Sequence, residues 1–199
     1  MKFVVATNNA HKYTEFCEML EKIGVELVMQ KDAGCNFEVD ETGSTFEENA
    51  YLKAAAVTNA TGMPAIADDS GLCVDALDGA PGLYSARYGP GHGASDKDKY
   101  MYLLSKMEGV EDRTAKFVSC ICCTFPNGDV ITSRGELHGR ILEQPVGNGG
   151  FGYDPVFWAD ESDKPNGLFT VEEKNAISHR GRAIRQFLPK LEDYLRNDK

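Results

Sequence analysis

The sequence is short of the features that mark membrane and nucleic-acid-binding proteins. None of its apolar runs approaches the length that spans a bilayer. Basic residues are scarce, since 21 Lys and Arg face 31 Asp and Glu for a formal net charge of −10. This balance disfavours a nucleic-acid coat or an anionic membrane surface, so we expect no nucleic acid and no membrane as partner. An anionic small substrate stays compatible with it, provided that local cations or a bound metal offset the global charge.

The cysteine pattern also excludes more than it suggests. The six cysteines offer a single Cys-x-x-Cys spacing, Cys120 to Cys123, whereas a zinc ribbon takes two such pairs, so a zinc ribbon is disfavoured. Cys120, Cys122 and Cys123 lie in an apolar segment and are expected to be buried thiols. The apolar stretch at the N-terminus is too short for a secretory signal. We therefore expect a cytoplasmic protein with reduced thiols.

Strand-like and helix-like segments alternate along the chain, which favours an α/β fold in a single domain over residues 1–199, or in two closely joined lobes. Phe16, Met19, Leu20 and Ile23 share one face of a helix that ends near Gly24. Asn127-Gly128 predicts a hairpin turn, and a hairpin amid α/β alternation predicts a mixed sheet. The patterns predict strands at 2–6, 25–29 and 64–67, helices at 45–60, 97–107 and 180–195, and hairpin strands at 116–125 and 129–137.

The acidic pair Asp68-Asp69 follows the apolar strand 64–67, at a point where Ser70-Gly71 predicts a turn. Carboxylates at the mouth of a sheet hold a hard cation or accept a proton from a nucleophile. Strand side chains alternate, so one acid should face a ligand and the other should cap or support the turn. A turn without chemistry is the alternative. Residues 72–77 fit either a strand or a helical turn.

Residues 7–12, Thr-Asn-Asn-Ala-His-Lys, lie between the first strand and the first helix. Free N–H groups at a helix start attract phosphate, and Lys12 adds a charge within one turn. The Gly-x-x-x-x-Gly-Lys pattern of a Walker loop is absent. A plain helix cap with a solvated Lys12 explains the segment equally well.

The second predicted helix is preceded and opened by acidic residues, and it contains one lysine beside several alanines. Thr45 and Glu48 have the spacing of a capping box, and Gly62 can close the helix. Glu48 is explained by the cap, whereas Glu41 precedes the helix in a loop and is the better metal ligand. Lys53 is either a solvated surface residue or part of a binding site.

Two later loops are rich in glycine, at 79–93 and 147–155, and such loops are often functional. The second offers the ring of Phe151 beside flexible backbone and Asp154, although buried aromatics usually belong to the core. Lys174 follows, and Ser178 has the position of a cap for the last helix. His179 and Arg180 would project from that helix's first turn, where a capped helix with a surface arginine is the alternative.

Six motifs in order resemble a known family. They are Thr7-Asn8-Asn9 with Lys12, Thr45-Phe46-Glu47-Glu48-Asn49-Ala50 with Lys53, Ala67-Asp68-Asp69-Ser70-Gly71-Leu72, the run from Gly79 to Tyr88, Phe151-Gly152-Tyr153-Asp154-Pro155, and Glu173-Lys174-Asn175 with Ser178-His179-Arg180-Gly181. Over nearly its whole length the chain is similar to the inosine-triphosphate/xanthosine-triphosphate pyrophosphatases. One departure is Asn8, where the family usually has glycine; asparagine tolerates the left-handed backbone better than most residues.

The resemblance implies an elongated mixed β-sheet flanked by helices, in two lobes with a nucleotide cleft between them. It implies hydrolysis of ITP, dITP or XTP between the α and β phosphates, giving a monophosphate and pyrophosphate, with Mg²⁺ and in a homodimer. Carried onto this sequence, the roles are as follows: Asp69 as general base and metal ligand, Glu41 as second metal ligand, Lys53 with Thr7, Asn8, Asn9, Ala10, His11 and Lys12 on the phosphates, Ser70 on the nucleotide, Phe151 with Gly152 and Tyr153 beside the base, and Asp154, Lys174, His179 and Arg180 reading it.

Base selection can be argued in part from chemistry. Hypoxanthine and xanthine carry an oxygen at position 6, which suits the donors of Lys174, His179 or Arg180, whereas adenine presents another donor. Rejection of GTP, which shares that oxygen, needs a further group at position 2. Two rival functions stay open. One is a magnesium phosphomonoesterase with an aspartyl nucleophile, although the Asp-Asp-Ser-Gly run matches the usual Asp-x-Asp pattern of that class poorly. The other is a nucleotide sensor without turnover.

Overall fold

A computed structural model describes residues 1–20, 23–91 and 93–197. The chain divides into two compact units, each assembled from separate segments. Unit 1 comprises residues 1–69, 119–135 and 180–199, and unit 2 comprises residues 70–118 and 136–179. The expected single domain over residues 1–199 and the expected cleft between two lobes both stay predictions.

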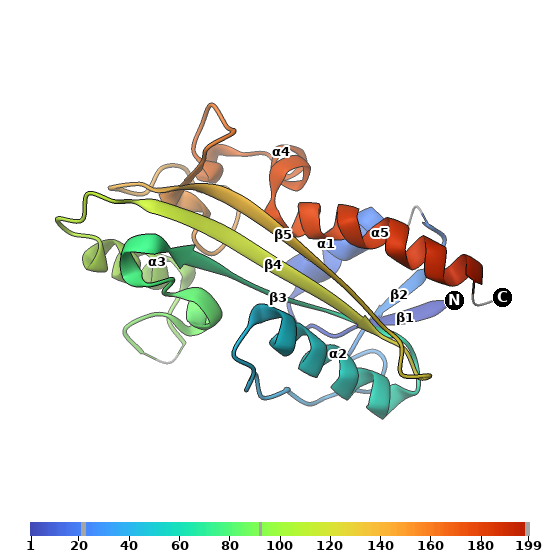
Figure 1. Cartoon of the computed structure of the whole chain (residues 1–199). Helices are drawn as coiled ribbons and strands as arrows, with labels where there is room; N and C mark the ends of the chain where they lie inside the picture. The colour runs from blue at the N-terminus through green and yellow to red at the C-terminus, as the bar shows by residue number, and fades with distance from the viewer. Residues whose placement is uncertain (21–22, 92, 198–199) are drawn as a thin grey trace. The chain divides into compact units, whose positions relative to one another are not determined.

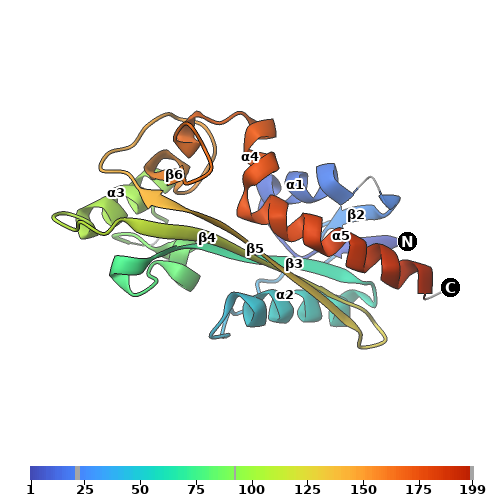
Figure 2. The ribbon, with the colours of Figure 1, turned by 45° about the horizontal axis from the view of Figure 1, so that its top comes forward.

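One six-stranded sheet has the strand order β2-β1-β3-β4-β5-β6 (Figure 1; β6 is labelled in Figure 2). Strand β1 pairs in parallel with β2 and β3, and β6 pairs antiparallel with β5. The predicted mixed sheet of an α/β fold is confirmed. The strands are β1 (Lys2–Val5), β2 (Glu26–Met29), β3 (Ala65–Val74), β4 (Thr114–Thr124), β5 (Val130–Ile141) and β6 (Phe157–Ala159).

Most of the helices were predicted. The α-helices are α1 (Ala10–Leu20), α2 (Phe46–Thr61), α3 (Asp96–Lys106), α4 (Val171–Ile177) and α5 (His179–Asn197). Short 3₁₀ turns are η2 (Asp75–Leu77), η3 (Gly82–Arg87), η4 (Asp154–Val156) and η5 (Asn166–Leu168). Among the described residues, no helix combines the length and the apolar character needed to cross a membrane.

Unit 1 has helices on both faces of its strands. Side chains alternate along β1, so Phe3 and Val5 pack with α1 and α5, whereas Val4 packs with the alanines of α2. Figures 1 and 2 show α2 on the opposite side of the strands from α1 and α5. Small residues such as Ala50 and Ala54 are fully buried, which allows α2 to approach the strands closely.

Unit 2 has its own hydrophobic core. Leu72 and Val74 of β3 pack with Leu103 and Met107 of α3 and with residues of β4, β5 and β6. Strands β3, β4 and β5 each contribute residues to both units. Among the described residues, unit 1 therefore has two apolar clusters and unit 2 has one.

The predicted caps of α2 are largely confirmed. The Thr45 side chain accepts a hydrogen bond from the backbone N–H of Glu48, and Gly62 ends the helix with a φ of 66°. The capping box is incomplete, because the Glu48 carboxylate accepts from the backbone N–H and hydroxyl of Ser44 instead of from Thr45. Glu48 thus serves as a cap, as expected.

The prediction of a turn at Ser70-Gly71 was wrong, because β3 continues through the acidic pair to Val74. Cationic side chains neutralise both aspartates, so the strand can bury them. The chain turns later, where Asp78 and Gly79 have positive φ. The undecided segment 72–77 contains the end of β3 and the turn η2.

Two elements were missed and two predicted segments were only partly described. The short strand β6 and the helix α4 were not predicted, although Thr170 and Glu173 form a complete capping box for α4. The first helix ends at Leu20 in the described chain, and residues 21–22 of its expected end lie outside it. The glycine-rich loop 79–93 contains the turn η3, and residue 92 lies outside the described residues.

The pairing of β5 with β6 generates a stability prediction. A Cβ atom added at Gly139 would lie 2.2 Å from the carbonyl oxygen of Trp158 and 2.9 Å from Cα of Ala159. We expect Gly139→Ala to lower the free energy of unfolding by about 1–3 kcal/mol, because backbone atoms must move apart. Urea denaturation measures this, with Gly91→Ala as control because its added Cβ meets nothing within 4 Å. Equal stability of the two variants would contradict the tight pairing.

Candidate active site

The two acids of β3 have different partners in unit 1. The carboxylate of Asp68 binds Lys12 Nζ at 2.6 Å and Arg180 at 3.3 Å, and its side chain is fully buried. The carboxylate of Asp69 binds Lys53 Nζ at 2.9 Å. The alternation of side chains along a strand explains this separation. The two acids have separate partners, whereas the prediction that one of them faces a ligand stays a prediction.

Asp68 joins four elements of unit 1. The hydroxyl of Ser119 on β4 donates to Asp68 Oδ1 at 2.5 Å. Arg180, from the first turn of α5, binds Asp68 and also Glu15 of α1 at 2.5 Å. The Arg180 side chain is only 2% exposed, so the alternative of a surface arginine is wrong. Its role in reading a base stays a prediction.

The opposite charges of this cluster stabilise one another's ionised forms. Burial disfavours the charged form of Asp68, yet Arg180 and Lys12 outweigh it and hold the pKa of Asp68 well below its usual value. Burial lowers the pKa of Lys12, an effect that Asp68 partly offsets. Removing any one charge would leave its partners buried without compensation.

The loop before α1 is a capped helix start whose lysine is not solvated. The Asn9 carboxamide oxygen accepts from the backbone N–H of His11 at 2.9 Å and of Lys12 at 3.2 Å. Asn9 N–H donates to the Thr7 hydroxyl at 3.1 Å. Asp78 is the one non-glycine residue in the described chain with positive φ, so Asn8 needs no left-handed backbone. Phosphate binding by residues 7–12 stays a prediction.

A second charge cluster in unit 1 contains Glu41, Lys53 and Asp69. Lys53 Nζ donates to Glu41 Oε1 at 2.8 Å and to Asp69 Oδ1 at 2.9 Å. Lys53 is therefore not a solvated surface residue, since its side chain is 14% exposed. The other oxygen of Asp69, Oδ2, is buried and has no hydrogen-bond partner. Burial raises the pKa of Asp69 despite the nearby ammonium, and Asp69 and Glu41 raise the pKa of Lys53 against the opposing effect of burial.

This pair of carboxylates fits a hard divalent cation. Among the described residues no three His, Cys, Asp or Glu side chains gather as a complete metal site. Mg²⁺ prefers oxygen ligands and commonly uses one or two carboxylates, completing its shell with water and substrate phosphates. Glu41 and Asp69 share one lysine, and the buried Asp69 Oδ2 has unused lone pairs. The donor set therefore suits Mg²⁺ better than zinc.

Unit 2 contains the predicted aromatic and charged groups. Asp154 Oδ2 binds Lys174 Nζ at 2.6 Å and accepts from the backbone N–H of Phe151 at 2.9 Å. The Lys174 ammonium lies 3.6 Å from the centroid of the Phe151 ring, a cation–π contact. The structure thus brings together Phe151, Asp154 and Lys174. Lys174 follows Asp154 by 20 residues in the sequence.

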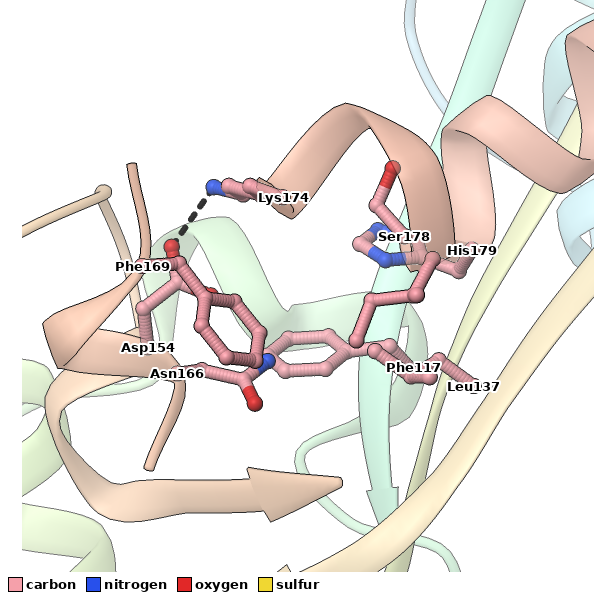
Figure 3. Close-up of a pocket in the computed structure, with 9 residues that line it drawn as sticks. Phe117, Leu137, Asp154, Asn166, Phe169, Lys174, Ser178 and His179 are labelled. Atoms are coloured by element: carbon pink, nitrogen blue, oxygen red, sulfur yellow. Dashed lines mark hydrogen bonds and ion pairs between the residues drawn. The ribbon is translucent and has the colours of Figure 1, made fainter. Parts of the chain in front are cut away.

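A small cavity adjoins these groups (Figure 3). Its volume is about 10 Å³, close to the space that a single water requires. The imidazole of His179 stacks on Phe117, with ring centroids 4.8 Å apart and an angle of 12° between the rings. Polar and aromatic side chains line it together: Phe117, Leu137, Asp154, Asn166, Phe169, Lys174, Ile177, Ser178 and His179.

Three predicted residues of unit 2 have other surroundings. Tyr153 is buried in the core of unit 2, and its hydroxyl donates to the Ser85 carbonyl at 2.8 Å. Gly152 donates its backbone N–H to Asp96 at 2.7 Å. Ser70 lies within β3. These contacts hold the loop around Phe151 in place, and direct substrate contact by Gly152, Tyr153 and Ser70 stays a prediction.

Sequence reasoning missed several groups of these clusters. Glu15 and Ser119 complete the Asp68 network, and no sequence pattern distinguished either of them. Phe117 sat in a segment predicted only as a hairpin strand. Asn166, between Pro165 and Gly167, has the composition of an ordinary turn, although it is buried beside the cavity.

The buried ion pairs of Asp68 generate a prediction for acid stability. We expect Asp68→Asn to cost about 3–5 kcal/mol of unfolding free energy near neutral pH, because two buried cations lose their partner. The folded pKa of Asp68 is depressed, so its stabilising effect is complete above about pH 4 and is lost as the pH falls through the folded value. The difference from wild type should therefore shrink below about pH 4.

Urea titrations from pH 7 to pH 3 measure this difference. Asp32→Asn is the matched control, since Asp32 is exposed. A difference between Asp68→Asn and wild type that stays constant down to pH 3 would show that Asp68 is not held ionised by its partners.

Comparison with known proteins places the chain in a family. The model of the Ham1 family matches residues 3–190. A dITP/XTP pyrophosphatase of Geobacter sulfurreducens is 50% identical over 185 residues, which cover 92% of each chain. Another dITP/XTP pyrophosphatase, from Symbiobacterium thermophilum, is 48% identical and covers 96% of this chain and 94% of its own. The Ham1 protein of Staphylococcus aureus is structurally similar over 100% of both chains, with a TM-score of 0.88 and 39% identity. The chain belongs to the Ham1 family.

Proposed function

We propose that the protein is a Mg²⁺-dependent nucleoside-triphosphate pyrophosphatase that hydrolyses ITP, dITP and XTP to the monophosphate and pyrophosphate. The observation that carries the proposal is the buried oxygen Oδ2 of Asp69, which has no hydrogen-bond partner while Oδ1 is held by Lys53. A carboxylate that is fixed through one oxygen and open at the other suits a proton acceptor or a metal ligand. The names of the relatives give the substrate class.

Asp69 accepts the proton of the attacking water in this proposal. Burial raises its pKa, which makes the carboxylate a stronger base than an exposed aspartate. Without metal and nucleotide, the Lys53 ammonium at 2.9 Å keeps Asp69 ionised and oriented. When bound to Glu41 and Asp69, Mg²⁺ would neutralise charge that develops on the phosphates.

Cations of unit 1 bind the triphosphate in this proposal. Lys12 and Lys53 both have buried or mostly buried ammonium groups that are already oriented by aspartates. The start of α1 adds the positive end of the helix dipole and the polar side chains of residues 7–12. Lysine binds phosphate as a point charge, so these contacts fix the anion without selecting a base.

The base contacts are assigned to Phe151, Asp154, Lys174, His179 and Arg180, the residues to which the family resemblance gives this role. Lys174 and His179 each carry N–H groups that match the 6-oxygen of hypoxanthine or xanthine. Adenine would place an amino group against these donors, at about 1–3 kcal/mol for each buried group left unpaired. The cavity holds only about one water, so it accommodates a ring substituent and not a whole purine.

Compartment and assembly belong to the proposal as well. All six cysteines are free thiols, which agrees with a reducing cytoplasm.

We assign the homodimer contact to the loop 80–88, where Tyr84 is 61% exposed. Sedimentation of wild type and Tyr84→Ser would test this assignment, which fails if both have the same oligomeric state.

A product assay with an Asp69 variant tests the reaction. Wild type should convert ITP with Mg²⁺ to IMP and pyrophosphate, whereas a phosphomonoesterase would release orthophosphate and a sensor would release nothing. Asp69→Asn should lower kcat by at least about 100-fold, because general base catalysis contributes that much. Phosphorus NMR identifies the products, and isothermal titration should show that the variant still binds ITP. Asp75→Asn, an exposed aspartate, is the control. Near-normal turnover of Asp69→Asn would remove Asp69 from its role.

Lys53 generates a separate prediction on metal binding. Its ammonium contacts both Glu41 and Asp69 and therefore competes with a divalent cation for the same oxygens. Without nucleotide, Lys53→Met should bind Mn²⁺ about tenfold more tightly than wild type, because the local charge becomes more negative. Electron paramagnetic resonance of free Mn²⁺ measures the Kd, and Lys53→Arg should resemble wild type. Weaker Mn²⁺ binding by Lys53→Met would mean that the lysine assembles the metal ligands instead of competing for them.

A further inference from the structure

The cavity of unit 2 has a polar group that the proposed function has not used, the carboxamide of Asn166. Asn166 begins the turn η5 and is only 2% exposed. Its Oδ1 accepts a hydrogen bond from the backbone N–H of Ala159 in β6 at 3.3 Å. Because Ala159 N–H can only donate, the oxygen must face β6, and the nitrogen Nδ2 takes the other side. Figure 3 shows this nitrogen among the residues that line the cavity.

The amide donor has no protein partner, in contrast to the charged groups around the cavity. Within residues 1–20, 23–91 and 93–197 no group accepts a hydrogen bond from Asn166 Nδ2, whereas Lys174 and Asp154 bind each other. Asn166 is almost fully enclosed as a residue, and a donor in such surroundings that lacks a protein acceptor is available to a ligand that completes it. The cavity volume of about 10 Å³ fits one oxygen atom of such a ligand.

The backbone fixes the position of this amide. The Asn166 carbonyl accepts from Phe169 N–H at 3.1 Å, and the Gly167 carbonyl accepts from Gly149 N–H at 2.8 Å. A Cβ on Gly167 would lie 2.2 Å from the Val146 carbonyl oxygen, so this turn is packed against the loop 146–149. A donor held this way cannot turn to suit either a donor or an acceptor on a ligand, which is what selectivity requires.

We propose that Asn166 is a specificity-determining residue that donates a hydrogen bond to the substituent at position 2 of the purine. The proposal rests on the proposed function and supplies the group that distinguishes XTP from GTP. Xanthine carries a carbonyl oxygen at position 2, which accepts from Nδ2. Guanine carries an amino group there, which would place two donors against each other, and hypoxanthine carries only hydrogen.

The location of a second donor supports position 2 over position 6. Figure 3 shows the Lys174 ammonium beside Asp154 and the Asn166 amide well apart from it. Two separated donors match the two separated carbonyl oxygens of xanthine, at positions 6 and 2. A second donor at position 6 would add nothing that tells GTP from ITP, because guanine and hypoxanthine share the 6-oxygen.

The test inverts the polarity of the side chain. Asn166→Asp replaces the donor Nδ2 by an acceptor oxygen. The variant keeps an oxygen that accepts from Ala159 N–H, so this hydrogen bond to β6 is retained. We expect kcat/KM at pH 9, where the carboxylate is ionised, to fall for XTP and rise for GTP, with at least a tenfold change in their ratio. ITP should change less than threefold, since hypoxanthine has only hydrogen at position 2. Leu168→Ala, an exposed neighbour in η5, should leave the ratio unchanged.

A binding measurement separates this proposal from the proposed function. Isothermal titration with XMP and GMP should show that wild type prefers XMP and that Asn166→Asp loses or reverses the preference, whether or not the protein hydrolyses triphosphates. Thermal denaturation confirms that the variant is folded. An XMP/GMP preference within threefold of wild type in the folded variant would overturn the proposal, as would an equal loss of activity on XTP, ITP and GTP.

Discussion

The buried carboxylate of Asp68 is the interaction on which the rest of unit 1 depends. It binds Lys12 from α1, Arg180 from α5 and Ser119 from β4, so one side chain on β3 ties together segments from the beginning, the middle and the end of the sequence. Burying such a charge is expensive unless every lone pair and every opposing charge is matched. The network therefore adds less net stability than its short distances suggest, but it strongly penalises any arrangement of α1 and α5 that leaves one partner unmatched.

Two acids at adjacent positions of one strand have different surroundings in this structure. Side-chain alternation sends Asp68 and Asp69 to opposite faces, so their partners do not overlap. Asp68 is saturated by three partners and its pKa falls, whereas Asp69 has one lysine and an open oxygen and its pKa rises. The same residue type thus acquires two opposite electrostatic characters from neighbours that lie far apart in the sequence.

What the sequence could predict follows from the range of the interactions involved. Local signals predicted α2, whose caps Thr45 and Gly62 lie within or beside the helix, and the hairpin turn at Gly128. The turn predicted at Ser70-Gly71 failed because the charges that neutralise the acidic pair come from distant segments, which no local pattern includes. For the same reason we could predict the charged residues of the site from the sequence but not Glu15, Ser119 and Asn166. The significance of these three depends on contacts with residues that are distant in the sequence or, for Asn166, on its place beside a cavity.

The charges of unit 1 also explain why a divalent cation belongs in the proposal. The two clusters contain three cations and four carboxylates, which gives them a formal net charge of −1 within a chain of net charge −10. The cations are Lys12, Lys53 and Arg180, and the carboxylates are Glu15, Glu41, Asp68 and Asp69. The lysines are therefore oriented but already neutralised, and they cannot by themselves attract a triphosphate. One Mg²⁺ would change the local balance from −1 to +1 and would free Lys53 from the carboxylates to contact phosphate. On this argument metal and nucleotide bind together, because each supplies the charge that the other needs.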